Sequence, residues 1–362
     1  MKNFKFINNI TGWIIFAIAS AVFILTIEPT ASFWDCGEFI ATAFKQEVGH
    51  PPGNPLFQML GFIATLFAGG NVKMIPITVN IYSALCSGFT ILFLFWSITH
   101  LARKIIGNKE EYTIAQLIAI MGSGIVGALA YTFSDSFWFS AVEAEVYASS
   151  SFFTAIVFWA ILKWEDVADE KYANRWLVLI AYLMGLSIGV HLLNLLTIPA
   201  IGLVYYFRKY PVTRKGVAIA VLISLTVLAV VLYGIVQGLF VIASWFELMF
   251  VNWFGLPFNS GWIFYTALII VLLVWGIGYT SKKGKVLWNT VILCVAVIIL
   301  GYSSYTMVII RSNADTPLNE NNPSNLFNLL SYLNREQYGD RPLIFGPCYN
   351  APITGSKEGK AI

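Results

Sequence analysis

The chain has 362 residues, of which 58% are hydrophobic and only 11% are charged, with a formal net charge of +3. A soluble globular domain carries about 25% charged residues, so this composition excludes a water-soluble protein. The small net charge says little about partners, because its distribution along the chain matters more than its sum. No feature of the sequence indicates a nucleic-acid partner.

Long runs without Asp, Glu, Lys or Arg divide the chain. They lie between Lys5 and Glu28, Lys73 and Arg103, Glu111 and Asp135, and Lys285 and Arg311. Each run exceeds the ~20 apolar residues that a helix needs to cross a bilayer. The predicted fold class is therefore an all-α polytopic membrane protein. Its nine predicted helices are roughly 11–28, 76–98, 113–133, 142–162, 176–191, 193–207, 216–237, 261–280 and 286–308.

The first run, Thr11 to Ile27, is interpreted as a retained helix rather than a removable signal peptide. It is long for a signal core, and Glu28-Pro29 makes a poor cleavage site.

Lys and Arg residues predict the orientation of these helices. Five groups fall between them: Lys2 and Lys5; Arg103, Lys104 and Lys109; Lys163, Lys171 and Arg175; Arg208, Lys209, Arg214 and Lys215; Lys282, Lys283 and Lys285. The nine-helix arrangement places every group on one side, which the positive-inside rule assigns to the cytoplasm. The N-terminus is then cytoplasmic, and the C-terminus lies on the opposite side.

The uncharged stretch 176–207 is ambiguous, because basic residues flank both of its ends. A single helix would send one basic flank outside, whereas a hairpin turned near 191–194 keeps both inside. The hairpin's helices would be about 16 residues each, which is short for spanning. We expect the hairpin.

Three regions are predicted to lie outside: the loop 29–75, the aromatic-rich loop 237–260, and the tail after Arg311. In the tail, Ser324 is a candidate N-cap for a short amphipathic helix over 325–337, and 342–345 is a candidate strand. We expect residues 1–311 to form a transmembrane domain. Residues 312–362 would begin an extracytoplasmic region that continues beyond this sequence.

The first outer loop holds the most informative polar residues. If 35–46 is helical, Asp35, Glu38 and Thr42 share one face. Such a carboxylate pair suits proton abstraction from a hydroxyl, with one acid as base and the other tuning its pKa. The competing interpretation is a pair of solvated loop charges. His50 lies in a Pro- and Gly-rich bend at 49–55, where it is either structural or functional, and 56–68 is too short to span and is expected in the interface.

A second acidic group begins the predicted helix 142–162. Glu143 and Tyr147 would share a face there, with Glu145 offset. These acids either complement the helix dipole or bind substrate or a metal, since acids at membrane depth are usually functional.

Three further polar residues lie in apolar surroundings. His191 and Asn194 are at the proposed hairpin turn, where a histidine commonly satisfies a core hydrogen bond. Arg311 ends the last helix, where it could bind a phosphate through a bidentate contact or extend to lipid headgroups.

Four strings of this sequence resemble a bacterial protein O-mannosyltransferase-like membrane family, long known only as a domain of unknown function. They are FWDCGEFIATAFKQEVGHPPGNPLF, FSDSFWFSAVEAEVYASSSFF, GLSIGVHLLNLLTIPAI and YLNREQYGDRPLI. The first string is long and specific, and together the strings cover nearly the whole chain. The family is assigned to the GT-C class of glycosyltransferases.

The resemblance implies a GT-C-like bundle and a polyprenyl-phosphate-linked sugar donor used at the outer face of a bacterial inner membrane. The acceptor it implies is a Ser or Thr hydroxyl of an extracytoplasmic protein, with membrane lipid as surroundings. The class places a catalytic acid in the first outer loop, a position that Asp35 matches, with Glu38 three residues on. Candidate substrate-binding residues are Lys45, His50, Glu143, Glu145, His191, Asn194 and Arg311.

Negative charge developing on the leaving phosphate would need a cation, for which Arg311, Lys45 and His191 are candidates in that order. Some members of the class use a divalent cation. Glu143 and Glu145 with Asp35 could hold one, but no ligand spacing decides it, and no metal is assigned.

Three other functions stay open, and one of them is a structural membrane subunit, which would need no loop such as 33–55. The same donor and membrane face would serve transfer to a glycolipid or lipid A. A transporter or flippase would instead need internal repeats and acids buried in mid-helix, neither of which is evident here.

Overall fold

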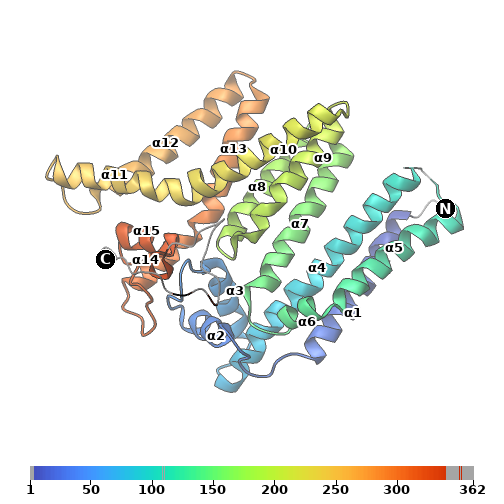
Figure 1. Ribbon diagram of the computed structural model, residues 1–362, viewed down its shortest axis with the longest axis horizontal. Coiled ribbons are helices and arrows are strands. Elements are labelled where there is room, and N and C mark those ends of the chain that lie inside the picture. Colours follow the sequence, from blue (N-terminus) through green and yellow to red (C-terminus); the bar gives the residue numbers. More distant parts are fainter. Residues whose placement is uncertain (1–3, 108, 110, 340–349, 351, 353–362) are drawn as a thin grey trace.

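The protein is an all-α polytopic membrane protein (Figure 1), and the computed structural model describes residues 4–107, 109, 111–339, 350 and 352. Its α-helices are α1 Phe4–Leu25, α2 Cys36–Lys45, α3 Pro55–Leu66, α4 Ile75–Ile106, α5 Ile114–Thr132, α6 Asp135–Ala141, α7 Val146–Val167, α8 Asn174–Ile188, α9 Ile198–Lys209, α10 Arg214–Ala229, α11 Gly238–Asn252, α12 Ser260–Lys282, α13 Val286–Tyr302, α14 Thr306–Ser312 and α15 Leu326–Asn334. Within the described residues, seven helical segments are long and apolar enough to cross a membrane. Helices α8 and α9, with 15 and 12 residues, are shorter.

The basic connections gather at one end of the bundle. Lys104 forms an ion pair with Glu165, and Arg208 Nε donates to the Glu165 carbonyl at 3.0 Å. At the same end, Asn174 of α8 donates to Thr290 of α13 at 3.0 Å. The turns between α9 and α10 and between α12 and α13 lie at the upper end of the bundle, whereas α2 and α6 lie at its lower end (Figure 1).

The hairpin predicted for 176–207 is confirmed. Helix α8 leaves the basic end, a short 3-10 segment over Leu192–Thr197 reverses the chain, and α9 returns. The return is fixed where Lys209 Nζ meets Asp169 Oδ1 at 2.8 Å. At the far end, the Leu56 amide donates to the Gly189 carbonyl at 2.8 Å, which joins the hairpin turn to the first outer loop.

Helices α8 and α13 pack with their backbones almost in contact. A Cβ added to Gly185 would lie 2.5 Å from the Ile298 carbonyl oxygen, and one added to Gly301 would overlap the Leu186 backbone. In a bilayer, where the hydrophobic effect adds little between helices, such close backbone packing is a main source of association. The α8–α9 hairpin is therefore held by α13 even though each of its arms is short.

The prediction of an aromatic loop over 237–260 was wrong. The helix that starts at Arg214 continues through a π-helical segment, Val230–Gln237, and on through α11 to Asn252, so only 253–259 is a connection. Nothing between 214 and 252 stops a helix, since that segment contains no proline and its mostly apolar side chains suit a bilayer. Figure 1 shows α11 extending away from the bundle and α12 returning toward α13.

The chain after α14 folds back onto the first outer loop. Backbone hydrogen bonds pair Val48 with residues 318 and 320, and α15 follows. The cap of α15 is Asn325 rather than the predicted Ser324, because the Asn325 side chain accepts from the Phe327 and Asn328 amides at 3.0 Å. The predicted strand at 342–345 lies outside the described residues.

Candidate functional site

The first outer loop presents Asp35 at the start of a short helix. Asp35 is the N-cap residue of α2, and its side chain makes no capping hydrogen bond, so the carboxylate is free to face outward. The preceding Trp34 has a φ of 63° and is 88% exposed. A left-handed backbone at a tryptophan costs free energy, and here it turns the chain sharply into α2.

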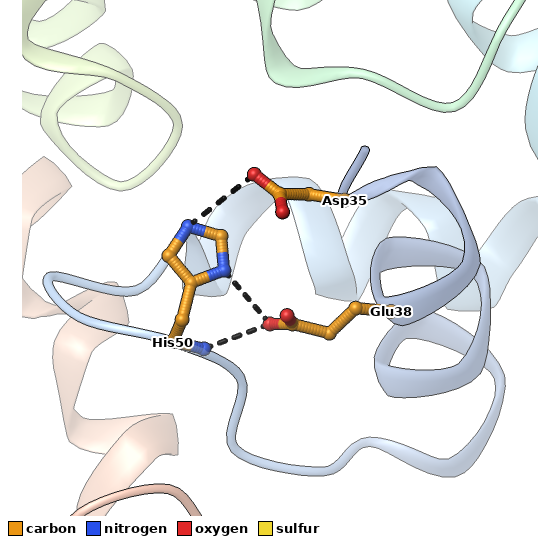
Figure 2. A group of neighbouring side chains, drawn as sticks. All are labelled: Asp35, Glu38 and His50. Atoms are coloured by element: carbon orange, nitrogen blue, oxygen red, sulfur yellow. Dashed lines mark hydrogen bonds and ion pairs between the residues drawn. The ribbon is translucent and has the colours of Figure 1, made fainter. Parts of the chain in front are cut away.

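Asp35, Glu38 and His50 lie together (Figure 2). Glu38 Oε1 accepts hydrogen bonds from the His50 backbone amide at 2.8 Å and from Nδ1 of the His50 ring at 3.0 Å. The other ring nitrogen, Nε2, lies 3.9 Å from Asp35 Oδ2. Asp35 is exposed, and Glu38 and His50 are only partly buried, so this cluster is open to a substrate.

Contacts from the far end of the chain hold the His50 loop. The Tyr332 hydroxyl of α15 donates to the Gly49 carbonyl at 2.6 Å, and the Tyr305 hydroxyl donates to the Gly53 carbonyl at 3.1 Å. Gly49 itself faces Glu38 so closely that an added Cβ would overlap Oε1. The loop therefore has one well-defined position relative to α2.

Glu38 and His50 stabilise each other's charged forms. Burial acts to raise the pKa of Glu38, but its hydrogen bonds to His50 outweigh burial and lower that pKa. The same contact with Glu38 raises the pKa of His50 against burial, helped by Asp35 and Glu320. An ionised Glu38 and a readily protonated imidazole are thus the expected state.

Glu143 and Glu145 form a second, buried acidic group beside α2. Their exposed fractions are only 4% and 7%. Ser32 donates to Glu143, and Cys36 Sγ lies 3.9 Å from Glu145 Oε1. Burial, aided by the charges of Glu143 and Asp35, raises the pKa of Glu145 to about 7. Burial likewise raises the pKa of the Cys36 thiol to about 12, so Cys36 is no nucleophile.

The predicted pairing of Glu143 with Tyr147 on one helix face was wrong. Helix α7 begins at Val146, and Glu145 is its N-cap residue, accepting from the Val146 amide at 3.2 Å. Glu143 therefore belongs to the preceding turn and points to Ser32, whereas Tyr147 packs against His191 with ring centroids 5.5 Å apart. Because the Glu145 carboxylate serves as the N-cap, the helix begins later than hydropathy suggested.

The remaining predicted residues have visible structural partners. His191 Nδ1 accepts from the Leu193 amide at 3.1 Å, and the fully buried Asn194 donates to Ser187 at 2.9 Å. Arg311 Nε donates to the Gln46 carbonyl at 2.5 Å, and a terminal nitrogen of Arg311 donates to the Lys45 carbonyl at 3.3 Å. These two hydrogen bonds cap the C-terminal end of α2. Lys45 itself is exposed, and its ammonium lies 5.0 Å from the Phe44 ring centroid.

One set of side chains in the described part of the chain is close enough to hold a metal ion. Ligand atoms of Asp35, Glu38 and His50 lie within 4.8 Å of one another. Carboxylates with one imidazole suit a divalent cation. This set differs from the sequence-based suggestion of Asp35 with Glu143 and Glu145.

Comparisons with known proteins point to one family. The family described as "Protein O-mannosyl-transferase TMEM260 N-terminal domain" matches residues 35–214, a stretch that begins at Asp35 and contains both acidic groups. The chain resembles protein O-mannosyl-transferases. Protein O-mannosyl-transferase TMEM260 of Mus musculus is 29% identical over 175 residues, covering 48% of this chain and 22% of that protein. The Dictyostelium discoideum protein tmem260 is 24% identical over 199 residues, covering 54% of this chain and 22% of that relative.

These matches support an O-mannosyltransferase-like family, and they span about a fifth of each relative's length. No solved structure matches this chain.

Sequence reasoning missed the residues that shape the site from the C-terminal side. Glu320 and Tyr332 approach His50 or its loop because the chain folds back after α14, whereas Tyr305 reaches the loop from the turn just before α14. Ser32 was also missed, although it supplies the hydroxyl that bonds Glu143. No local pattern marks such long-range partners.

Proposed function

We propose that this chain is the membrane part of a glycosyltransferase that moves a hexose, mannose by analogy with its relatives, from a polyprenyl-phosphate donor to Ser or Thr hydroxyls of extracytoplasmic proteins. The observation that carries the proposal is the cluster of Asp35, Glu38 and His50 at the end of the bundle opposite the basic connections. The positive-inside rule assigns the basic end to the cytoplasm. The cluster would then face the outer side of a bacterial inner membrane, with the N-terminus cytoplasmic and the C-terminus periplasmic.

The chemistry is a direct displacement of the GT-C type. Asp35 deprotonates or orients the acceptor hydroxyl, whose oxygen attacks the anomeric carbon of the sugar. The bond from that carbon to the phosphate oxygen breaks, and the lipid phosphate leaves with the electron pair. No cofactor is required by this scheme.

Positive groups near the leaving phosphate would stabilise its charge. Arg311 is the first candidate, because it lies at the C-terminal end of α2 with two of its nitrogens on the carbonyls of Lys45 and Gln46. Lys45 is exposed at the same place. Two neighbouring turns are proposed to shape the substrate-binding surface. They carry Glu143 and Glu145 before α7, and His191 and Asn194 after α8.

The test compares the glycoproteins outside the cytoplasm in cells that carry the wild-type protein, the Asp35→Asn variant, or none. Loss of an O-linked hexose in both the variant and the null cells, with normal amounts of folded variant, is the expected result. An unchanged set of glycoproteins together with an altered glycolipid would move the acceptor to lipid. A variant that behaves as wild type in every fraction would refute the role of Asp35.

A further inference from the structure

Hydrogen bonds fix both the backbone and the ring of His50 in its loop. Its amide and ring are both fixed by Glu38, and the carbonyls on either side of its loop accept from Tyr332 and Tyr305. Its ring also lies near Phe39, with centroids 5.6 Å apart. This arrangement fixes the direction of Nε2, and Figure 2 shows that nitrogen on the side of Asp35.

The partner of Nδ1 sets the tautomer of the ring. An ionised carboxylate can only accept hydrogen bonds, so the 3.0 Å contact with Glu38 Oε1 places a proton on Nδ1. In the neutral ring, Nε2 then carries the lone pair. At 3.9 Å from Asp35 Oδ2, Nε2 is beyond direct hydrogen-bonding distance and stays available to a substrate.

We propose that His50, oriented by Glu38, is the group that accepts the proton of the attacking hydroxyl, and that Asp35 stabilises the imidazolium that forms. This assignment rests on the proposed function. As the oxygen–carbon bond forms and the bond to the phosphate oxygen breaks, the hydroxyl proton moves to Nε2. It is later released to water, which returns the ring to its neutral form.

The surroundings favour a positive charge on this ring. Among the described residues, the charged groups that act on His50 are acids: Asp35 just before α2, Glu38 within it, Glu145 at the start of α7, and Glu320 in the returning chain. The hydrogen bond to Glu38, with the charges of Glu38, Asp35 and Glu320, raises the pKa of His50 against the effect of burial, so the ring is a stronger base than a free imidazole.

Chemical rescue tests the proposal in native membranes, with a polyprenyl-phosphate mannose donor and a Ser/Thr-containing acceptor protein. We expect His50→Ala to lower kcat by about 100-fold or more, the usual contribution of a general base, and we expect added imidazole to restore part of it. Asp35→Asn should also be impaired, but imidazole should not restore it. Asp135→Asn, an exposed acid outside the cluster, is the matched control and should match wild type.

The results separate this inference from the proposed function. Wild-type membranes with no transfer would refute the proposed function itself. Active wild-type membranes with a fully active His50→Ala variant, or with a folded variant that imidazole does not rescue, would overturn the role of His50 alone.

A second measurement serves if His50→Ala does not fold. The wild-type transfer rate should decrease as the pH falls below the pKa of His50, which is raised above 6.5, because protonation of His50 removes the base. Glu38→Gln should move this limb clearly to lower pH, because it removes the hydrogen bond that raises the pKa of His50 most. Glu145→Gln removes a more distant carboxylate whose own pKa is about 7, and the limb should remain with at most a small shift. A limb that disappears in Glu145→Gln would overturn the proposal.

Discussion

Replacing Gly49 by alanine tests whether the contact between Glu38 and His50 matters. The backbone of Gly49 does not need glycine, since its φ is not among the positive values. Its importance is steric, because a Cβ there would overlap Glu38 Oε1 and also approach Thr42 Cγ2 at 3.5 Å. The carboxylate must move away, and it then loses its bonds to the His50 amide and ring.

The expected cost follows from those two bonds. Hydrogen bonds to a charged group contribute roughly 1.5–3 kcal/mol each when buried. The Glu38 side chain is 21% exposed, so solvent replaces part of this, and we expect a loss of about 2 kcal/mol. If that loss falls on the orientation of His50, kcat should decrease by roughly 10- to 100-fold, with little change in KM.

Gly37→Ala is the matched control. Gly37 lies in α2, directly before Glu38, but a Cβ added to it would meet only Ala31 at 3.7 Å, an ordinary contact. Alanine is also the better helix former by about 1 kcal/mol, so this variant should be active and at least as stable as wild type. Steady-state transfer rates and thermal unfolding in detergent provide the comparison. Equal rates for Gly49→Ala and Gly37→Ala would refute the reasoning.

Three further outcomes are expected. Tyr332→Phe removes the 2.6 Å bond to the Gly49 carbonyl and should lower the free energy of unfolding by about 1 kcal/mol; an unchanged unfolding temperature would contradict this. The raised pKa of Glu145, about 7 against 4.5 for the free side chain, means that ionising it opposes folding, so stability should decrease as the pH rises from about 4.5 through 7. Glu145→Gln should flatten that decrease in thermal unfolding, and an unchanged pH profile would count against the burial of a proton there. Transfer should withstand EDTA, because Glu38 and His50 already satisfy each other; loss of activity that Mn²⁺ restores would instead favour a metal at this cluster.

The sequence predicted the membrane helices well because their signals are local and strong. Uncharged runs and basic clusters identified the spans and the α8–α9 hairpin, since each depends on hydropathy within a window of about 20 residues. The prediction failed over 237–260, where aromatic residues suggested an interfacial loop but the backbone stays helical to Asn252. Hydropathy does not distinguish an apolar loop from an apolar helix that extends beyond the span.

The candidate site was predicted only in its first loop. Helical spacing placed Asp35 and Glu38 together, and the structure adds His50, which was a candidate without a partner. The acids Glu143 and Glu145 were expected nearby, but their separate roles depend on where α7 begins. The support from Tyr305 and Tyr332 depends on contacts over more than 250 residues, which a reading of local patterns does not reveal.

The most direct test of the account measures sugar transfer in native membranes by the wild-type protein and by Asp35→Asn. A radiolabelled polyprenyl-phosphate mannose would be the donor, and protein-bound label released by β-elimination would be the signal. We predict O-linked label that depends on wild-type protein and is lost in the equally abundant, folded variant. Transfer by Asp35→Asn at the wild-type rate, or no protein-bound label from wild-type membranes, would contradict the central claim.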